Sequence, residues 1–185
     1  MKDKLMFFLT FLKNPGEVGS ITPSSKFLTD SMINNIDFSN AGFIAEYGSG
    51  TGIITREIIK RAKKDAKILC FETNRKLCTY LKKSIKDKRA IIINDGAENI
   101  KSHMKRHNIP RIDYVLAVLS FSTLGAEKKA DIMEETKNAL RDGGRFVFCR
   151  YLPHFEKNLR KYFSRNFVKF IPFNIPPSLV YVCEK

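Results

Sequence analysis

Short apolar runs alternate with amphipathic stretches along most of this 185-residue chain. Five of the apolar runs have the length and composition of buried strands, at residues 42–47, 67–72, 90–94, 114–118 and 145–149. Between them, helical spacing of apolar positions is found near residues 52–63, 97–107 and 126–140, and in a stretch for which Asn74 is the expected cap. This alternation predicts a parallel sheet with right-handed crossovers, and the helix over 126–140 should end at Asp142-Gly143-Gly144, where glycine supplies a left-handed cap.

The carboxyl-terminal stretch follows a different pattern. A basic amphipathic helix is expected over residues 154–165, and the apolar runs 167–171 and 179–183 are predicted strands. The proline-containing link between these strands is too short for a crossover helix, so they should pair antiparallel. The predicted fold is therefore α/β: a Rossmann-like sheet of seven strands, mostly parallel, with an antiparallel carboxyl-terminal hairpin and helices on both faces.

Two further helices are expected before the first strand. Residues 5–12 are the most hydrophobic stretch, and lysines flank it. This run is too short to cross a bilayer, and it either lies in a membrane interface or docks on the protein's own core. After a turn-rich break, Thr22 or Ser24 should cap a second helix. The buried face of that helix is expected to carry Phe27, Leu28, Met32, Ile33 and Ile36.

The length of the chain suits one domain, residues 1–185. Within it, residues 1–40 form the N-terminal helices, a candidate membrane or substrate lid, and residues 41–185 form the Rossmann-like core. The chain has 33 Lys and Arg against 19 Asp and Glu, a formal charge of +14. Such a field attracts nucleic acid or an anionic membrane surface, and charge alone does not choose between them. Part of this charge belongs to solvated helix faces.

Cysteine and histidine give no sign of a metal site. The four cysteines are scattered, with neither metal-ligand nor disulfide spacing, and the histidines are not grouped. His103 and His107 are expected on the surface of a helix. With no cleavable leader pattern in view, these features predict a cytoplasmic protein with reduced, packed thiols and no metal.

The first strand leads directly into a glycine-rich turn. Gly48, Gly50 and Gly52 follow it, and the next helix points free backbone N–H groups back at the turn. The spacing departs from the dinucleotide fingerprint G-x-G-x-x-G, because Ile53 occupies the place of the third glycine. The pattern Glu46-x-Gly48-x-Gly50-x-Gly52 instead resembles motif I of the class I S-adenosylmethionine-dependent methyltransferases.

The other candidates follow from the rule that ligands of open α/β sheets lie at the carboxyl ends of the strands. Glu72 closes the second strand and offers two oxygens to two ribose hydroxyls. Asp95, after the third strand, either accepts a hydrogen bond from the adenine amino group or caps the next helix. Glu46 either orders the ammonium end of the cofactor through water or stiffens the loop. The predicted cofactor residues are Glu46, Gly48, Ser49, Gly50, Gly52, Glu72, Asp95, Gly96 and Ala97.

Methyl transfer from a sulfonium needs an acceptor lone pair held in line and a site that matches the moving charge, but no catalytic triad. The expected acceptor-side residues are Leu119, Ser120 and Phe121 after the fourth strand and Tyr151 after the fifth. Phe121 and Tyr151 either form an aromatic wall around an amine that becomes cationic or pack in the core and its rim.

With these residues placed, nearly the whole chain resembles the bacterial phospholipid N-methyltransferases. The resemblance is carried by residues 11–15 and 18–25, by the loop at 46–52, and by Asn174-Ile175-Pro176-Pro177 before the last strand. It implies stepwise methylation of phosphatidylethanolamine, with S-adenosylmethionine converted to S-adenosylhomocysteine. It also implies a protein that is monomeric in solution and peripherally bound to the anionic inner face of the membrane. The chain departs from the family after the fourth strand, where serine replaces a proline and no glycine precedes it.

Two alternatives remain open on the sequence. An RNA adenine dimethyltransferase has a similar cofactor loop and would also suit the positive charge. Such enzymes carry a polar residue, one or two prolines and an aromatic after the fourth strand to hold a flipped base, and here only the aromatic is kept. They also carry an added helical domain, for which this chain has no room. The second alternative is a membrane- or RNA-binding module without turnover, which an intact Glu72 and Asp95 argue against.

Overall fold

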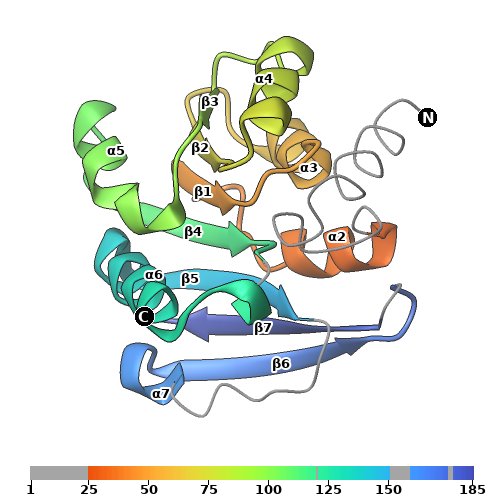
Figure 1. Ribbon diagram of the computed structural model, residues 1–185, viewed down its shortest axis with the longest axis vertical. Helices are drawn as coiled ribbons and strands as arrows, with labels where there is room; N and C mark the ends of the chain where they lie inside the picture. Colours follow the sequence, from red (N-terminus) through yellow and green to blue (C-terminus); the bar gives the residue numbers. More distant parts are fainter. Residues whose placement is uncertain (1–24, 120, 151–158, 175–176) are drawn as a thin grey trace.

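The computed structural model describes residues 25–119, 121–150, 159–174 and 177–185. Its strands form one seven-stranded sheet in the order β3-β2-β1-β4-β5-β7-β6 (Figure 1). The strands are β1 (Phe43–Tyr47), β2 (Lys67–Phe71), β3 (Ala90–Ile93), β4 (Ile112–Ala117), β5 (Leu140–Arg150), β6 (Arg165–Ile171) and β7 (Ser178–Glu184).

The pairing of the strands confirms the predicted fold class. Strands β1 to β5 pair parallel, while β7 pairs antiparallel with both β5 and β6. The chain thus reverses direction only in its last hairpin, as the short proline-containing link requires. All seven strands appear where apolar runs were found, with ends shifted by a few residues.

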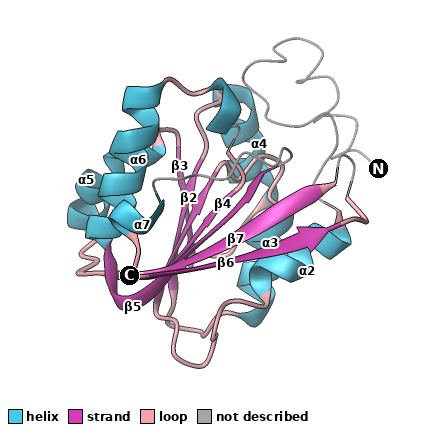
Figure 2. Cartoon of the chain, turned by 90° about the horizontal axis from the view of Figure 1, so that it is seen from below, coloured by secondary structure: helices cyan, strands magenta, loops and turns pink. Residues whose placement is uncertain are grey.

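Helices cover both faces of the sheet (Figure 2). Buried side chains of α2 and α3 pack with Ile44, Ile68 and Leu116 on one face. Those of α5, α6 and α7 pack on the other face. The helices are α2 (Lys26–Ile33), α3 (Ile53–Arg61), α4 (Arg75–Ser84), α5 (Ile100–Arg106), α6 (Ala126–Ala139) and α7 (Leu159–Tyr162), with short 3-10 turns η1 (Ala97–Asn99) and η2 (Phe121–Thr123).

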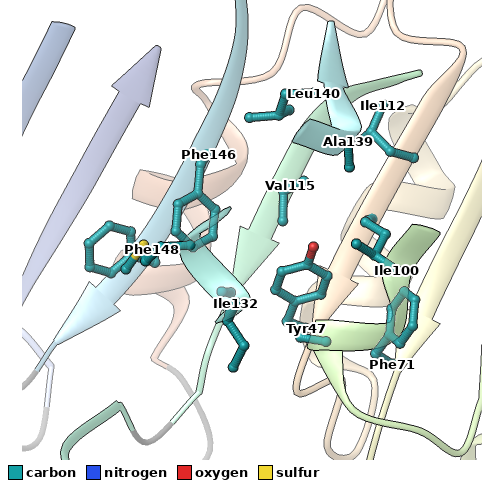
Figure 3. Packing of buried hydrophobic residues seen from close by; sticks show 14 of the residues in the cluster. Tyr47, Phe71, Ile100, Ile112, Val115, Ile132, Ala139, Leu140, Phe146 and Phe148 are labelled. Atoms are coloured by element: carbon teal, nitrogen blue, oxygen red, sulfur yellow. The ribbon is translucent and has the colours of Figure 1, made fainter. Parts of the chain in front are cut away.

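The larger core cluster lies under α5 and α6 and is rich in aromatic rings. Tyr47, Phe71, Phe146 and Phe148 converge there from four different strand positions (Figure 3). The ring of Tyr47 meets that of Phe71 edge to face at 5.6 Å, and Phe146 stacks on Phe148 at 4.9 Å. Aromatic packing therefore joins β1, β2 and β5 into one rigid platform beneath the strand ends.

The end of α6 differs from the prediction. Helix α6 ends at Ala139, and Leu140 is already extended with ψ 143°. The fully buried Leu140 pairs with Ile112, and Gly143 (φ 69°) lies in a bulge before Arg145 pairs with Tyr114. The left-handed glycine thus bends strand β5 and does not cap the helix, because burial of Leu140 ends the helix earlier.

Other predictions near the chain ends also change. Ser25, and not Thr22 or Ser24, caps α2, with its hydroxyl accepting from the N–H of Leu28. Phe27 points outward, while the other four predicted core residues of that helix region are buried. Of the predicted helix over 154–165, residues 154–158 lie outside the described residues, the described part contains α7, and the chain is extended from Arg165 onward.

Several predictions lie outside the described residues. These are the helix over residues 5–12, most of the candidate lid, Ser120 and Tyr151. Within the described residues, no helix has the length and apolar character needed to span a bilayer. All four cysteines are buried and unpaired, as expected, with Cys78 on α4 and the others on strands.

Candidate active site

The glycine-rich turn after β1 folds over the end of β2. The N–H groups of Gly48 and Ser49 both donate to the carbonyl of Phe71, at 2.9 and 3.0 Å. Gly48, Gly50 and Gly52 all have positive φ, at 76°, 55° and 82°. Only glycine adopts this backbone without strain, so the spacing of the three glycines follows from the shape of the turn.

At two of these glycines, neighbouring protein atoms leave no space for a side chain. A Cβ at Gly48 would lie 2.7 Å from the carbonyl oxygen of Val118, at the end of β4. A Cβ at Gly52 would lie within 3 Å of side-chain carbons of Leu81 and Ile85, beside α4. The turn is thus held directly against the start of the acceptor-side segment, which follows Val118.

Glu72 is buried and is fixed through both of its carboxylate oxygens. One oxygen accepts from the N–H of Gly50 and the other from the N–H of Asn74, each at 2.8 Å. A carboxylate offers about four acceptor positions, two on each oxygen. The glycine turn and the end of β2 are therefore joined at one buried acid.

Glu46 is buried at the end of β1 and bonds to the following helix. Its carboxylate accepts a hydrogen bond of 2.5 Å from the hydroxyl of Thr55 in the first turn of α3. Burial, opposed by this hydrogen bond, raises the pKa of Glu46 to about 7. Of its two predicted roles, the structure shows the bond that stiffens the loop.

Asp95 is the centre of a hydrogen-bonded cluster after β3. One carboxylate oxygen accepts from the N–H of Gly96 and the side chain of Asn99, both at 2.8 Å. The other lies 2.8 Å from Nε2 of His103. The hydrogen bond to His103 is the main reason that the pKa of Asp95 is lowered. Because an ionised Asp95 only accepts, Nε2 of His103 carries the proton.

His103 was predicted at the helix surface, and this is wrong: only 6% of it is exposed. Its ring meets that of Phe71 edge to face at 5.4 Å. Ile100, His103 and Met104 have the i, i+3, i+4 spacing of a buried helix face, so the signal was present in the sequence. A histidine beneath the predicted adenine-binding acid is thus the residue that sequence reasoning missed.

The turn that follows Asp95 is tightly packed. Gly96 lies under the carboxylate of Glu98, where a Cβ would be 2.3 Å from a carboxylate oxygen. Glu98 forms an ion pair of 2.8 Å with Lys128 of α6, and Ala97 is buried. This contact draws the η1 turn toward α6, so the candidate adenine side of the site is supported by a second helix.

The strand ends bring the predicted cofactor residues together. Gly50 and Glu72 share a hydrogen bond, and Asn94 donates to the carbonyl of Glu72 at 2.8 Å, which places Asp95 beside them. These residues therefore occupy adjacent tips of β1, β2 and β3, as predicted. The arrangement is a small, partly buried cluster of carboxylates and backbone N–H groups, suited to a polar nucleoside.

The acceptor side is described only in part. Leu119 is half-buried beside Gly48, and Phe121 is buried with its ring 5.4 Å from that of Phe148. The structure thus shows the packing role for Phe121. Ser120 and Tyr151 lie outside the described residues.

Asn174 links two segments that carried the family resemblance. Its side-chain oxygen accepts from the N–H of Ser25 at 3.1 Å, and its amide donates to the hydroxyl of Ser178 at 2.8 Å. Asn174 is buried, so this connection fastens the start of α2 to the turn between β6 and β7. Ser25 and Asn174 are distant in sequence and adjacent in space.

Elsewhere, a cavity of about 410 Å³ lies between α7 and β6 and contacts none of the predicted cofactor residues. The described residues contain no cluster of three His, Cys, Asp or Glu side chains that could hold a metal ion.

The fold and the clustered strand ends define a class I, Rossmann-like methyltransferase. Residues 45–148 match the family model described as a methyltransferase domain, and the chain belongs to that family. It is therefore an S-adenosylmethionine-dependent methyltransferase, which confirms the predicted cofactor and the predicted class of enzyme.

Individual relatives refine this assignment. The chain is 26% identical to an ornithine lipid N-methyltransferase of Singulisphaera acidiphila, covering 100% of this chain and 97% of the relative. It is 35% identical to a ribosomal RNA small subunit methyltransferase A of Mesomycoplasma hyopneumoniae, but over only 37% of this chain and 25% of that one. Among solved structures, a precorrin-6y C5,15-methyltransferase of Geobacter metallireducens has a TM-score of 0.67 at 11% identity, covering 85% of this chain and 87% of that one.

Proposed function

We propose that this protein methylates the amino group of a membrane lipid. The observation that carries the proposal is the similarity along the whole chain to the ornithine lipid N-methyltransferase. The similarity to the ribosomal RNA enzyme covers a quarter of that relative. Phosphatidylethanolamine, the acceptor implied by the family resemblance, and an ornithine lipid are the first two acceptors to test, since both present an amine beside a lipid headgroup.

In this proposal, each strand end binds a different part of S-adenosylmethionine. Glu72 accepts from the ribose hydroxyls while it remains bonded to the turn, and the Gly48–Gly52 backbone gives the methionine end a close approach. Asp95, fixed by His103, accepts from the adenine amino group, with Gly96 and Ala97 alongside. When bound, S-adenosylmethionine supplies an electrophilic methyl group on a sulfonium.

The acceptor side would position a neutral amine and exclude water. Leu119, Ser120 and Phe121 follow β4 in the sequence, Tyr151 follows β5, and the side chain of Leu119 lies beside Gly48. We assign Leu119, Ser120 and Tyr151 the task of holding the amine nitrogen in line and surrounding the cation that forms as nitrogen gains a bond, while the buried Phe121 supports this segment by packing on Phe148. The ammonium form of the acceptor must lose its proton to solvent before it enters the site, because only the neutral nitrogen has a lone pair for attack.

The decisive experiment offers the competing acceptors together. Purified protein is incubated with methyl-labelled S-adenosylmethionine, liposomes containing phosphatidylethanolamine and ornithine lipid, and total RNA. We expect label in one lipid fraction, and far less label with a Glu72→Ala variant when S-adenosylmethionine is limiting. The matched control Glu57→Ala removes an acid paired with Lys60 on the surface of α3 and should keep full activity. Label in RNA alone would transfer the assignment to the adenine methyltransferases.

Association with the inner face of the cytoplasmic membrane is part of the same proposal. It is supported by the net charge of +14 and by the apolar, lysine-flanked residues 5–12. Flotation with anionic liposomes tests the anchor: a chain lacking residues 1–13 should float less well, and equal flotation would remove that segment from the proposal. Sedimentation should find a monomer in solution.

A further inference from the structure

The described residues contain five large apolar side chains that are exposed, and all five lie in one part of the fold. They are Phe27 on α2, Phe167, Val168 and Phe170 on β6, and Phe173 in the turn after β6. The four phenylalanines are 59%, 62%, 60% and 71% exposed. Large exposed apolar groups that gather in one place usually mark a contact surface.

This cluster lies toward the end of the sheet that carries the site. β6 is antiparallel to β7, which is antiparallel to β5, so β6 runs in the same direction as the parallel strands. Its carboxyl end, with Phe170, therefore lies at the same edge of the sheet as Glu72 and the glycine turn (Figure 1). Phe173 follows directly, and its ring lies 5.3 Å from that of Phe27.

Basic residues accompany these rings. Over residues 159–174, which are all described, the sequence has Arg160, Lys161, Arg165 and Lys169 and no acidic residue. Lys169 lies between Phe167 and Phe170 and is itself exposed. An apolar strip interleaved with cations matches a surface that has phosphate groups above an apolar layer.

The directions of the exposed side chains favour a lipid surface over a folded protein as the binding partner. Alternation along β6 places Phe167 and Phe170 on opposite faces of the sheet, and both remain exposed because β6 is the edge strand. A flat protein surface would cover one face, whereas an edge that enters a lipid interface buries both rings at once.

We propose that the β6 edge, formed by Phe27, Phe167, Phe170, Phe173 and Lys169, docks on an anionic lipid surface. The proposal rests on the proposed function and specifies how the site meets its acceptor. Docking along this edge brings the strand ends, and so the cofactor cluster, to the level of the lipid headgroups. The contact uses residues other than 5–12 and adds a second attachment that orients the domain.

The sequence contains no tryptophan, which allows a clean test. Phe173→Trp places a single fluorophore in the proposed contact, and Thr79→Trp places one on the exposed side of α4, near the opposite edge of the sheet. With phosphatidylcholine vesicles containing about one third phosphatidylglycerol, emission of the first variant should shift to shorter wavelength and be quenched by brominated acyl chains. The second variant should not respond.

A second measurement links docking to turnover. The triple variant Phe167→Ser, Phe170→Ser, Phe173→Ser should partition onto these vesicles about 10-fold less, since three apolar contacts are lost. It should methylate vesicle lipid correspondingly slowly, yet keep its unfolding transition, its calorimetric affinity for S-adenosylhomocysteine and its rate on a dispersed short-chain acceptor.

The outcomes separate the two proposals. Unchanged partition of the triple variant, with lipid still labelled by the wild type, overturns the docking edge and leaves the function intact. No labelling of any lipid by the wild type defeats the function itself. Blue-shifted emission of the Phe173→Trp variant without vesicles, a dimer that the triple variant breaks, or an equal loss of RNA binding would each assign the edge to another partner and overturn the proposal.

Discussion

The two ends of the sheet treat the same kinds of side chain in opposite ways. On β1 and β2, four of five residues are buried, and even the acids Glu46 and Glu72 at the strand ends lie inside and are hydrogen-bonded. On β6 only Ile171 is buried, and phenylalanines alternate with cations in the open. The inner strands satisfy their side chains within the protein, whereas the outer strand leaves its apolar groups exposed to a partner.

This difference shows that the apolar character of a residue does not by itself indicate whether its side chain is buried or exposed. Phe146 and Phe167 belong to the same sheet, yet one has aromatic rings on several sides and the other has solvent. The inner half is specified by packing and hydrogen bonds within the chain. The outer edge gains its main apolar contact only when a partner is present.

The largest effect is expected when Phe146 and Phe167 are each replaced by alanine and the stabilities of the two variants are compared. Phe146→Ala should lower the free energy of unfolding by about 3–5 kcal/mol, because it empties the centre of the aromatic platform. Phe167→Ala should change it by less than about 0.5 kcal/mol. Urea unfolding followed by circular dichroism measures both values. Similar losses in the two variants would abolish the distinction between the halves.

Next in size is the buried acid of β1. The pKa of Glu46 is raised from 4.5 to about 7, so the folded protein retains a proton that the unfolded chain has released between these values. The stabilising contribution is complete below pH 4.5 and is lost as pH rises through 7. Glu46→Gln removes this dependence and should become more stable than the wild type by up to about 3 kcal/mol above about pH 7.

Urea unfolding of both proteins without cofactor, repeated from about pH 5 to about pH 8, tests the sign as well as the size. A difference that stays flat across this range would show that Glu46 titrates normally and is not part of the tightly closed inner half.

Removal of Glu72, the second buried acid of the inner strands, should weaken cofactor binding. Glu72→Ala deletes the acceptor for two backbone N–H groups and, in our proposal, for two ribose hydroxyls. The dissociation constant for S-adenosylhomocysteine should rise about 100-fold, as expected for lost hydrogen bonds to a charged group. Calorimetry measures it, with Glu57→Ala as the surface control. An unchanged constant would reject the cofactor cluster.

The smallest effect concerns His103. His103→Phe removes the partner that lowers the pKa of Asp95, so the dissociation constant should rise about 5-fold, the size of one hydrogen bond. Because the pKa of Asp95 then rises, binding should fail at a higher pH on the acid side than in the wild type. His103→Gln, which keeps a donor, should restore the profile. Identical acid limbs in all three proteins would exclude the positioning role.

The regular parts of the fold were predictable because their signals are local. Strands β1 to β4 are short apolar runs, and the turn through Gly48 and Gly52 needs glycine for reasons of backbone geometry and close approach. Glu72 followed from its place at the end of β2. The family resemblance added the acceptor class, which no local pattern contains.

The missed features depend on contacts between distant residues. Burial of His103 follows from Asp95 and Phe71, and the choice of Ser25 over its neighbours as a cap goes with the bond to Asn174. The exposure of Phe170 could not be read from its own strand, because it results from the position of β6 at the edge of the sheet. Sequence patterns give the periodicity of an element but not its neighbours.

The place of β7 has a consequence for how the protein is made. β7 follows β6 in the chain but lies between β5 and β6. During translation, β5 leaves the ribosome with one side unpaired and remains so until synthesis has passed Glu184. An open apolar strand invites capture by chaperones or by another nascent chain. The half of the protein that, in our proposal, meets the lipid surface is therefore also the last to take shape, after the half that contains β1, β2 and β3 has been synthesised.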